Sequence, residues 1–101
     1  MFARLDGFMT GYLHQDWDVE YDSAEAAARD FAANSEIERV AEVIGEIAVL
    51  SNGDGEQRVS ELWRERSWDY YPGEGCYAEF LRSLGGWMST VAADRLDESR
   101  S

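Results

Sequence analysis

Apolar residues recur every three or four positions between Ile37 and Ala48, and this spacing limits what the chain can fold into. The members of the stripe are Ile37, Val40, Ala41, Ile44, Ile47 and Ala48. Such spacing places apolar side chains on one face of an α-helix. Ser35 followed by Glu38 has the pattern of a capping box at the start of this helix, and the sequence SNGDG at residues 51–55 predicts its end. We therefore expect a helix whose apolar stripe faces a core.

The same spacing predicts two helices before this stripe. A first helix ends near His14, and its inward residues are Phe2, Leu5, Phe8, Met9, Tyr12 and Leu13. Ser23 is suited to the N-cap of a second helix over about residues 24–33. The inward residues of that helix are Ala27, Ala28 and Phe31.

Two more helices are expected after the stripe. One carries Val59, Leu62 and Trp63. The last runs from about Tyr77 to Leu96, and its inward residues are Tyr77, Phe80, Leu81, Leu84, Met88 and Val91. Gly85 and Gly86 lie in the middle of this helix and either kink it or allow close packing.

No segment shows the sustained alternation of polar and apolar residues that is typical of strands. We therefore predict an all-α fold, with residues 1–101 forming a single small domain of about five packed helices. The last few residues, about 97–101, are expected to be a frayed tail.

Acidic residues outnumber basic ones by 21 to 9, which gives this chain of 101 residues a formal net charge of -12. Such a charge repels nucleic acid phosphates and anionic membrane surfaces, so we expect neither as a partner, whereas it attracts a basic protein. The excess is uneven, because residues 1–56 carry 13 acids and 3 arginines (net -10) and residues 57–101 carry 8 acids and 6 arginines (net -2). Acidity that served solubility alone would not require this division.

The rest of the composition predicts a cytoplasmic location. No apolar run approaches the roughly 20 residues that span a bilayer, and residues 1–10 lack the long apolar core of a secretory signal. The single Cys76 cannot form an intrachain disulfide, so an oxidising compartment is not indicated.

The only histidine, His14, begins the sequence HQDWDVEYDS, which is the natural place to look for a chemical site. A catalytic triad would need a nucleophile, and Thr10 and Ser23 are near in sequence, but no nucleophile motif accompanies them. One His and one Cys are too few for a zinc site.

Alternating acids in the same sequence imitate the first oxygen ligands of a calcium loop. They are Asp16, Asp18, Glu20 and Asp22. An EF-hand requires Gly and Glu at positions that hold Tyr21 and Ala27 here. We therefore predict that the chain is not an enzyme and has no cofactor and no metal site.

Two interpretations of HQDWDVEYDS remain. In the structural one, Trp17 and Tyr21 pack over the first and third helices, while His14 and Asp16 bond backbone groups and Asp22 or Ser23 caps the second helix. In the functional one, the acids and aromatic residues form an anionic binding patch. We assign His14, Asp16 and Trp17 first to structure. We assign Asp18, Glu20 and Asp22 first to a binding surface.

The sequence GYLHQDWDVEYDSAEAAARDF at residues 11–31 closely resembles the signature of a family of contact-dependent growth inhibition immunity proteins, the CdiI type. The later WDYYPGEGCYAEFLRSL, residues 68–84, is similar to the second conserved mark of that family. The resemblance implies a small helical cytoplasmic protein that binds and blocks the C-terminal domain of a delivered toxin, often a nuclease. Because members of such a family protect against unlike toxins, the shared motif of His14, Gln15, Asp16 and Trp17 is better explained as scaffold than as a toxin-reading surface.

Glu38, Glu42 and Glu46 are further candidates for contact with a basic toxin. Their spacing of four residues places them on one helix face, roughly opposite the apolar stripe, where each like-charge pair costs about 0.2–0.5 kcal/mol. An exposed face of an acidic protein is the ordinary alternative for each of them. At the level of function, the alternative is an acidic helical adaptor or regulator that binds another basic protein. The oligomeric state stays open.

Overall fold

The computed structural model describes residues 2–14, 17–53, 55–68, 70–73 and 75–100, and these residues form helices and no strand. The helices are α1 (Ala3–Tyr12), α2 (Trp17–Glu20), α3 (Ala24–Asn34), α4 (Ile37–Gly53), α5 (Glu56–Glu65) and α6 (Tyr77–Arg100). The prediction of an all-α fold is therefore confirmed. Five long helices lie where the apolar spacing predicted them, and the single-turn α2 is additional.

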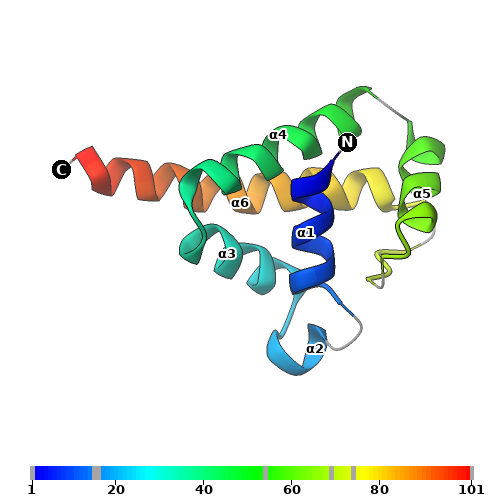
Figure 1. Ribbon diagram of the computed structural model, residues 1–101, viewed down its shortest axis with the longest axis horizontal. Coiled ribbons are helices and arrows are strands. Elements are labelled where there is room, and N and C mark those ends of the chain that lie inside the picture. The colour runs from blue at the N-terminus through cyan, green and yellow to red at the C-terminus, as the bar shows by residue number, and fades with distance from the viewer. Residues whose placement is uncertain (1, 15–16, 54, 69, 74, 101) are drawn as a thin grey trace.

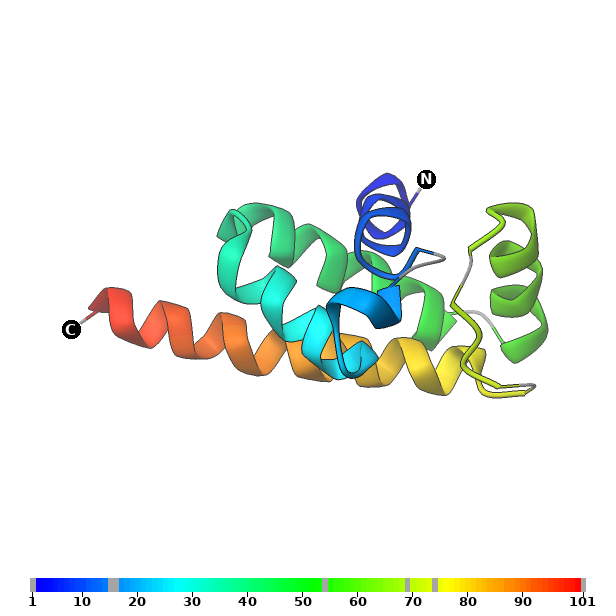
Figure 2. The ribbon, with the colours of Figure 1, turned by 90° about the horizontal axis from the view of Figure 1, so that it is seen from below.

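The long helix α6 packs against three of the other helices, α3, α4 and α5. α3 and α4 both pack along it, and α1 crosses over α3 and α4 on their other side, so that these two helices lie between α1 and α6 (Figures 1 and 2). α5 packs near the start of α6, and α2 projects beside the end of α1. The chain runs in opposite directions along α4 and α6 (Figure 1).

Apolar side chains from α1, α3, α4, α5 and α6 share one core. Its largest fully buried members are Phe8, Leu5, Met9, Leu13, Ile47, Leu50, Leu81, Leu84, Met88, Val40, Val43 and Val59. The expected inward residues of α3 are confirmed, because Ala27, Ala28 and Phe31 are all buried. The core continues into the segment after α5 through Trp68, whose indole Nε1 donates to Asp6 of α1 at 2.8 Å.

The buried face of α4 differs from the predicted stripe. Ala41 and Ala48 were expected inside and are exposed, whereas Val43 and Leu50 are buried together with Val40 and Ile47. The apolar residues of α4 cover more than one face of the helix, so only part of them fits against α1, α3 and α6. The remainder stays at the surface.

Gly85 allows α4 and α6 to pack closely. A Cβ at this position would lie 3.3 Å from Cγ2 of Ile47, a separation tighter than an ordinary van der Waals contact. Of the two expectations for the glycine pair, close packing holds at Gly85, and α6 continues without interruption through both residues. Nothing lies within 4 Å of a Cβ built on Gly86.

The N-terminal ends of two helices are capped by glutamates from elsewhere in the chain. The Glu46 carboxylate of α4 accepts from the backbone N–H groups of Leu5 at 2.9 Å and Arg4 at 3.3 Å, at the start of α1. The Glu56 carboxylate accepts from Tyr77 at 3.0 Å and Ala78 at 2.8 Å, at the start of α6. Both carboxylates satisfy amide groups that have no partner within their helix and meet the positive end of its dipole.

Two arginines of α6 donate hydrogen bonds to backbone carbonyls at the C-terminal ends of α3 and α4. Arg95 Nη1 donates to the carbonyls of Ala32 at 2.6 Å and Ser35 at 2.7 Å, where α3 ends. Arg82 Nη2 donates to the carbonyl of Ser51 at 3.2 Å, in the last turn of α4. Cations favour the negative end of the helix dipole, so these contacts have the sign that stabilises both helices.

Three predicted helix boundaries are corrected by the structure. Ser35 is the C-cap of α3, with its backbone N–H donating to the Phe31 carbonyl, and α4 begins at Ile37, so Ser35 is not the N-cap of α4 and the expected capping box with Glu38 does not stand at its start. α4 continues to Gly53 instead of ending before the SNGDG sequence. α6 continues to Arg100, past the expected end near Leu96, because residues 97–100 include no glycine or proline to end it.

Candidate functional site

The HQDWD segment joins α1 to the rest of the fold through backbone and aromatic contacts. His14 is half-buried, and its carbonyl accepts from the Trp17 N–H at 2.9 Å. Gln15 and Asp16 lie outside the described residues. Trp17 is half-buried and packs edge-to-face on Tyr70, with ring centroids 5.2 Å apart. Trp17 therefore contacts the segment that leads into α6, a contact that the sequence did not predict.

Tyr21 makes the contact to α1 that the structural interpretation predicted, and it also contacts α3, which is the second of the expected helices and not the third. Its ring stacks on Tyr12 of α1 with centroids 6.2 Å apart, and its hydroxyl donates to Asp30 Oδ2 of α3 at 2.6 Å. The hydrogen bond to the Asp30 carboxylate, together with burial, raises the pKa of the Tyr21 phenol well above its ordinary value. Ser23 accepts from the Ala26 N–H at 3.1 Å and is the N-cap of α3, as predicted.

The acids of α2 and the turn after it face solvent. Asp18, Glu20 and Asp22 are exposed, and their carboxylates form no ion pair among the described residues. Val19 stands between two of them with 82% of its side chain accessible. α2 buries none of its residues, which places the whole turn at the edge of the molecule (Figure 1).

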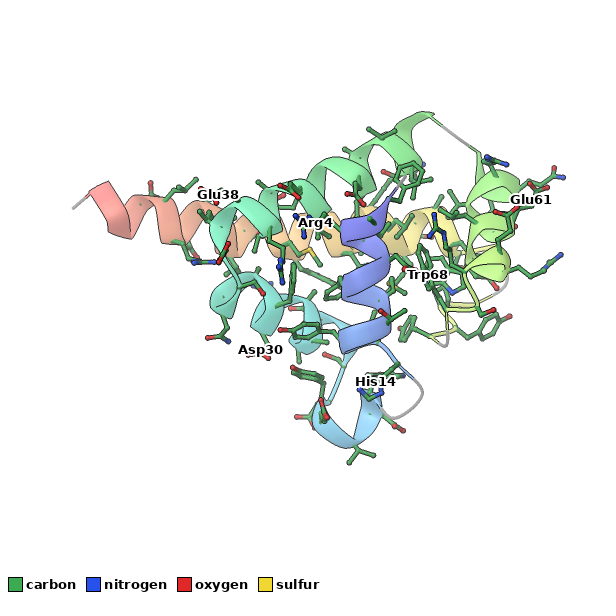
Figure 3. All side chains as sticks on the ribbon, viewed as in Figure 1. Arg4, His14, Asp30, Glu38, Glu61 and Trp68 are labelled. Atoms are coloured by element: carbon green, nitrogen blue, oxygen red, sulfur yellow. The ribbon has the colours of Figure 1, made fainter. Side chains whose placement is uncertain are left out.

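The three glutamates on α4 have different surroundings. Glu46 is half-buried and caps α1, and Glu42 pairs with the guanidinium of Arg4 on α1 (Arg4 is labelled in Figure 3). Glu38 is exposed, and its carboxylate takes part in no ion pair among the described residues. The even spacing of these residues therefore does not give three equivalent surface charges.

A groove between α4 and α6 was not predicted. It is lined by Ile44, Ile47, Ala48, Ser51, Arg82, Gly85 and Ser89 and has a volume of about 220 Å³. Two signals in the sequence point to it. The apolar stripe of α4 is broader than one buried face, and residues 83–93 of α6 contain no charged side chain.

Within the described ranges, no cluster of three or more His, Cys, Asp or Glu side chains could hold a metal ion. None of the described helices is both long and apolar enough to cross a membrane.

Comparison with known proteins identifies the family. The profile described as CdiI immunity protein matches residues 1–91, which is most of the chain. The chain belongs to the CdiI immunity protein family. Neither the curated proteins nor the solved structures include a significant match to it.

Family membership fixes the general role of this immunity protein. Proteins of the family neutralise toxins of contact-dependent growth inhibition, and they are inhibitors rather than enzymes. The partner is therefore a cognate toxin protein. Binding needs an accessible surface, and the structure offers the acids beside α2, the exposed Glu38, and the groove between α4 and α6.

Proposed function

We propose that this immunity protein binds a toxin domain with a basic surface in the cytoplasm, and that uncompensated carboxylates steer the encounter. The acids proposed for this role are Asp18, Glu20 and Asp22 beside α2 and Glu38 on α4. Their exposure, without an ion-pair partner in the part of the chain that the structure describes, is the observation that carries the proposal. Opposite charges on two proteins accelerate association and favour the correct partner.

The arginines of the protein support the same proposal because several of them have partners within the fold. Arg82 and Arg95 cap helix ends, and Arg4 and Arg29 pair with neighbouring glutamates. The net charge of -12 gives the protein a negative field that attracts a basic partner. Glu42 and Glu46 have partners within the fold, so we propose a structural role for them.

A basic toxin surface is typical of proteins that grip phosphates, so we propose a toxin that acts on nucleic acids. An inhibitor can occupy such a surface with carboxylates. The reaction is tested by incubating DNA or RNA with the C-terminal domain of the large secreted protein encoded immediately upstream of the gene for this chain. Nucleic acid degradation that stops when the immunity protein is added is the expected result.

We propose that His14, Gln15, Asp16 and Trp17 serve as scaffold. The support comes from Trp17, which links α2 to Tyr70, and from the backbone bond between His14 and Trp17. A motif used in this way can be shared by proteins that bind unlike toxins.

Steering is tested by measuring association of the same toxin domain at different salt concentrations. We expect the association rate to fall at least about tenfold from low to high salt, while the dissociation rate changes much less, because screening shortens to about 8 Å at physiological ionic strength. An association rate that does not respond to salt contradicts a basic partner.

Charge-reversal variants test which acidic residues accelerate association with the toxin domain. Asp18 and Glu20 are changed together to Arg, and the matched control changes Glu61 and Glu65 of α5 to Arg, which alters the net charge equally. We expect slower association for the α2 pair than for the α5 pair. Equal slowing indicates that total charge, and not a located group of acids, controls the encounter.

A further inference from the structure

A hollow with a volume of about 240 Å³ is lined by residues of α1, α3 and α4, three helices that pack against one another. Part of its wall consists of the aromatic rings of Phe8 and Tyr12 on α1 and Phe31 on α3, whose centroids are between 5.1 and 5.5 Å apart. Phe8 and Phe31 are buried, so the core fixes this part of the wall. The volume exceeds the roughly 150 Å³ cavity that holds a benzene ring, which leaves room for one side chain of a partner.

The charged residues that line the hollow are Arg4 of α1 and Arg39 of α4, and none of the acidic residues in the described ranges lines it. Both arginines are exposed. Arg4 pairs with Glu42, whereas Arg39 belongs to no ion pair among the described residues. Glu36 and Glu38, which precede Arg39 in the sequence, lie outside the lining. This arginine hollow therefore presents a positive group on a chain whose net charge is -12.

Gly7 leaves one side of the arginine hollow open. It lies inside α1, where a glycine costs about 0.5–1 kcal/mol relative to alanine. Nothing lies within 4 Å of a Cβ built on Gly7, so no neighbouring helix requires the absence of a side chain there. A larger side chain at this position would narrow the hollow that Gly7 lines. The glycine therefore weakens the helix and keeps the hollow accessible.

A carboxylate is the group that this hollow fits best. The planar guanidinium of an arginine offers paired N–H donors that match the two oxygens of a carboxylate. The hydroxyl of Ser35, which also lines the hollow, is a further donor. The aromatic rings keep water away from one side, and an ion pair is stronger where water is excluded. A lysine or arginine of a partner would be repelled by Arg39.

The carboxylate can come from the toxin domain or from a second copy of this chain. Two copies would each bring a net charge of -12 and would repel each other. The toxin domain is the cognate partner of an immunity protein of this family. A side chain that projects from its surface reaches the hollow, because both arginines are exposed to solvent.

We propose that the arginine hollow receives an acidic side chain, Asp or Glu, of the toxin domain. This inference rests on the proposed function, because it assigns a further contact with the same partner. Acids on the immunity protein attract any basic protein, so attraction alone selects poorly between toxins. A cationic hollow repels basic residues at one place and accepts a carboxylate there, which fixes the orientation of the correct toxin and disfavours others.

Arg39→Glu tests the charge of the hollow, and Arg64→Glu is the matched control. Arg64 is an exposed residue of α5 that belongs to no ion pair among the described residues, and both changes alter the net charge equally. Affinity is measured by calorimetry with the purified C-terminal domain of the large secreted protein encoded immediately upstream. We expect Arg39→Glu to weaken binding at least about 30-fold, because it places one carboxylate against another, and Arg64→Glu to change it by less than about threefold.

Gly7→Leu tests the space in the hollow without changing its charge, and Gly11→Leu is the matched control. Gly11 is an exposed residue of α1 that does not line the hollow, and nothing lies within 4 Å of a Cβ built on it. Leucine favours a helix more than glycine does, so neither variant should have a lower melting temperature by circular dichroism. We expect Gly7→Leu to weaken toxin binding at least about tenfold and Gly11→Leu to leave it within about threefold.

The toxin residue is identified by changing the Asp and Glu residues of the toxin domain to Arg one at a time. We expect one of these changes to restore the affinity for Arg39→Glu at least about tenfold, because the two charges are then exchanged and attract again.

Equal affinities within each matched pair, or no restoration by any toxin variant, overturn the arginine hollow as a contact while leaving the proposed function intact. A wild-type chain that is a dimer by light scattering, and that Arg39→Glu converts to a monomer, overturns it in favour of a second copy. A wild-type chain that does not bind the toxin domain overturns the proposed function itself.

Discussion

Replacement of Glu46 by Ala tests whether a helix can depend on a cap supplied by another helix. α1 has no side-chain cap of its own, because its N-cap residue is Phe2. The Glu46 carboxylate is therefore the group that meets the amide groups of Leu5 at 2.9 Å and Arg4 at 3.3 Å. Removing it leaves both amides without this acceptor and takes a negative charge from the positive end of the helix dipole.

The magnitude follows from these contacts. A helix cap contributes about 1 kcal/mol, and a hydrogen bond to a charged group contributes about 1.5–3 kcal/mol. One of the two bonds is long and the glutamate is half-exposed, so we expect Glu46→Ala to lower the free energy of unfolding by about 2 kcal/mol. For a domain of this size that corresponds to a fall in melting temperature of about 10 °C. Glu46→Gln keeps an acceptor but loses the charge, and we expect about half of this effect.

Urea denaturation followed by circular dichroism measures the effect as a lower midpoint with an unchanged slope. The matched control is Glu38→Ala, which removes the same side chain from an exposed position on the same helix. We expect the control to change stability by no more than about 0.5 kcal/mol. If Glu46→Ala and Glu38→Ala have the same midpoint, the cap does not stabilise α1 and the reasoning is wrong.

Two other residues give further predictions. Trp17→Ala should lower the free energy of unfolding by about 2 kcal/mol, below the roughly 3–5 kcal/mol of a fully buried aromatic residue, because Trp17 is half-buried on Tyr70; an unchanged urea midpoint would contradict the packing role. Tyr21→Phe should alter the pH dependence of stability, because the pKa of the Tyr21 phenol is raised in the folded protein. The stabilisation is fully present below the ordinary value near 10 and is lost as the pH rises from there through the raised value of the folded protein, so the difference in urea midpoint between wild type and Tyr21→Phe should be smaller at about pH 11 than at about pH 9. A constant difference between the two midpoints over that range would show that the phenol proton does not contribute.

Local spacing was enough to predict the long helices and many of their buried residues. Phe8, Phe31 and Leu84 are inside because each lies on a stripe with a single possible inward face. α4 is different, since its apolar residues surround more than one face. Ala48 was therefore expected inside and Leu50 was not, and only the positions of α1 and α6 decide between them.

The candidate sites were predicted to a similar extent. The exposure of Asp18 and Glu20 follows from the short polar sequence that separates two helices. Glu46 could not be recognised as a cap, because its partners lie 41 and 42 positions away and the sequence does not show which helices cross. The groove between α4 and α6 could not be predicted for the same reason, because it forms only where two helices that are distant in sequence pack together.

The arginine caps of α6 have a consequence for how the protein is made. α6 is the last of the described helices to leave the ribosome, and it carries both Arg82 and Arg95. Until it emerges, the final carbonyls of α3 and α4 lack these donors, and the apolar faces of both helices lack the surface on which they pack. A nascent chain that stops before α6 therefore cannot hold these helices in their final arrangement. Any toxin binding that needs α3 and α4 in this arrangement has to wait until α6 has been synthesised.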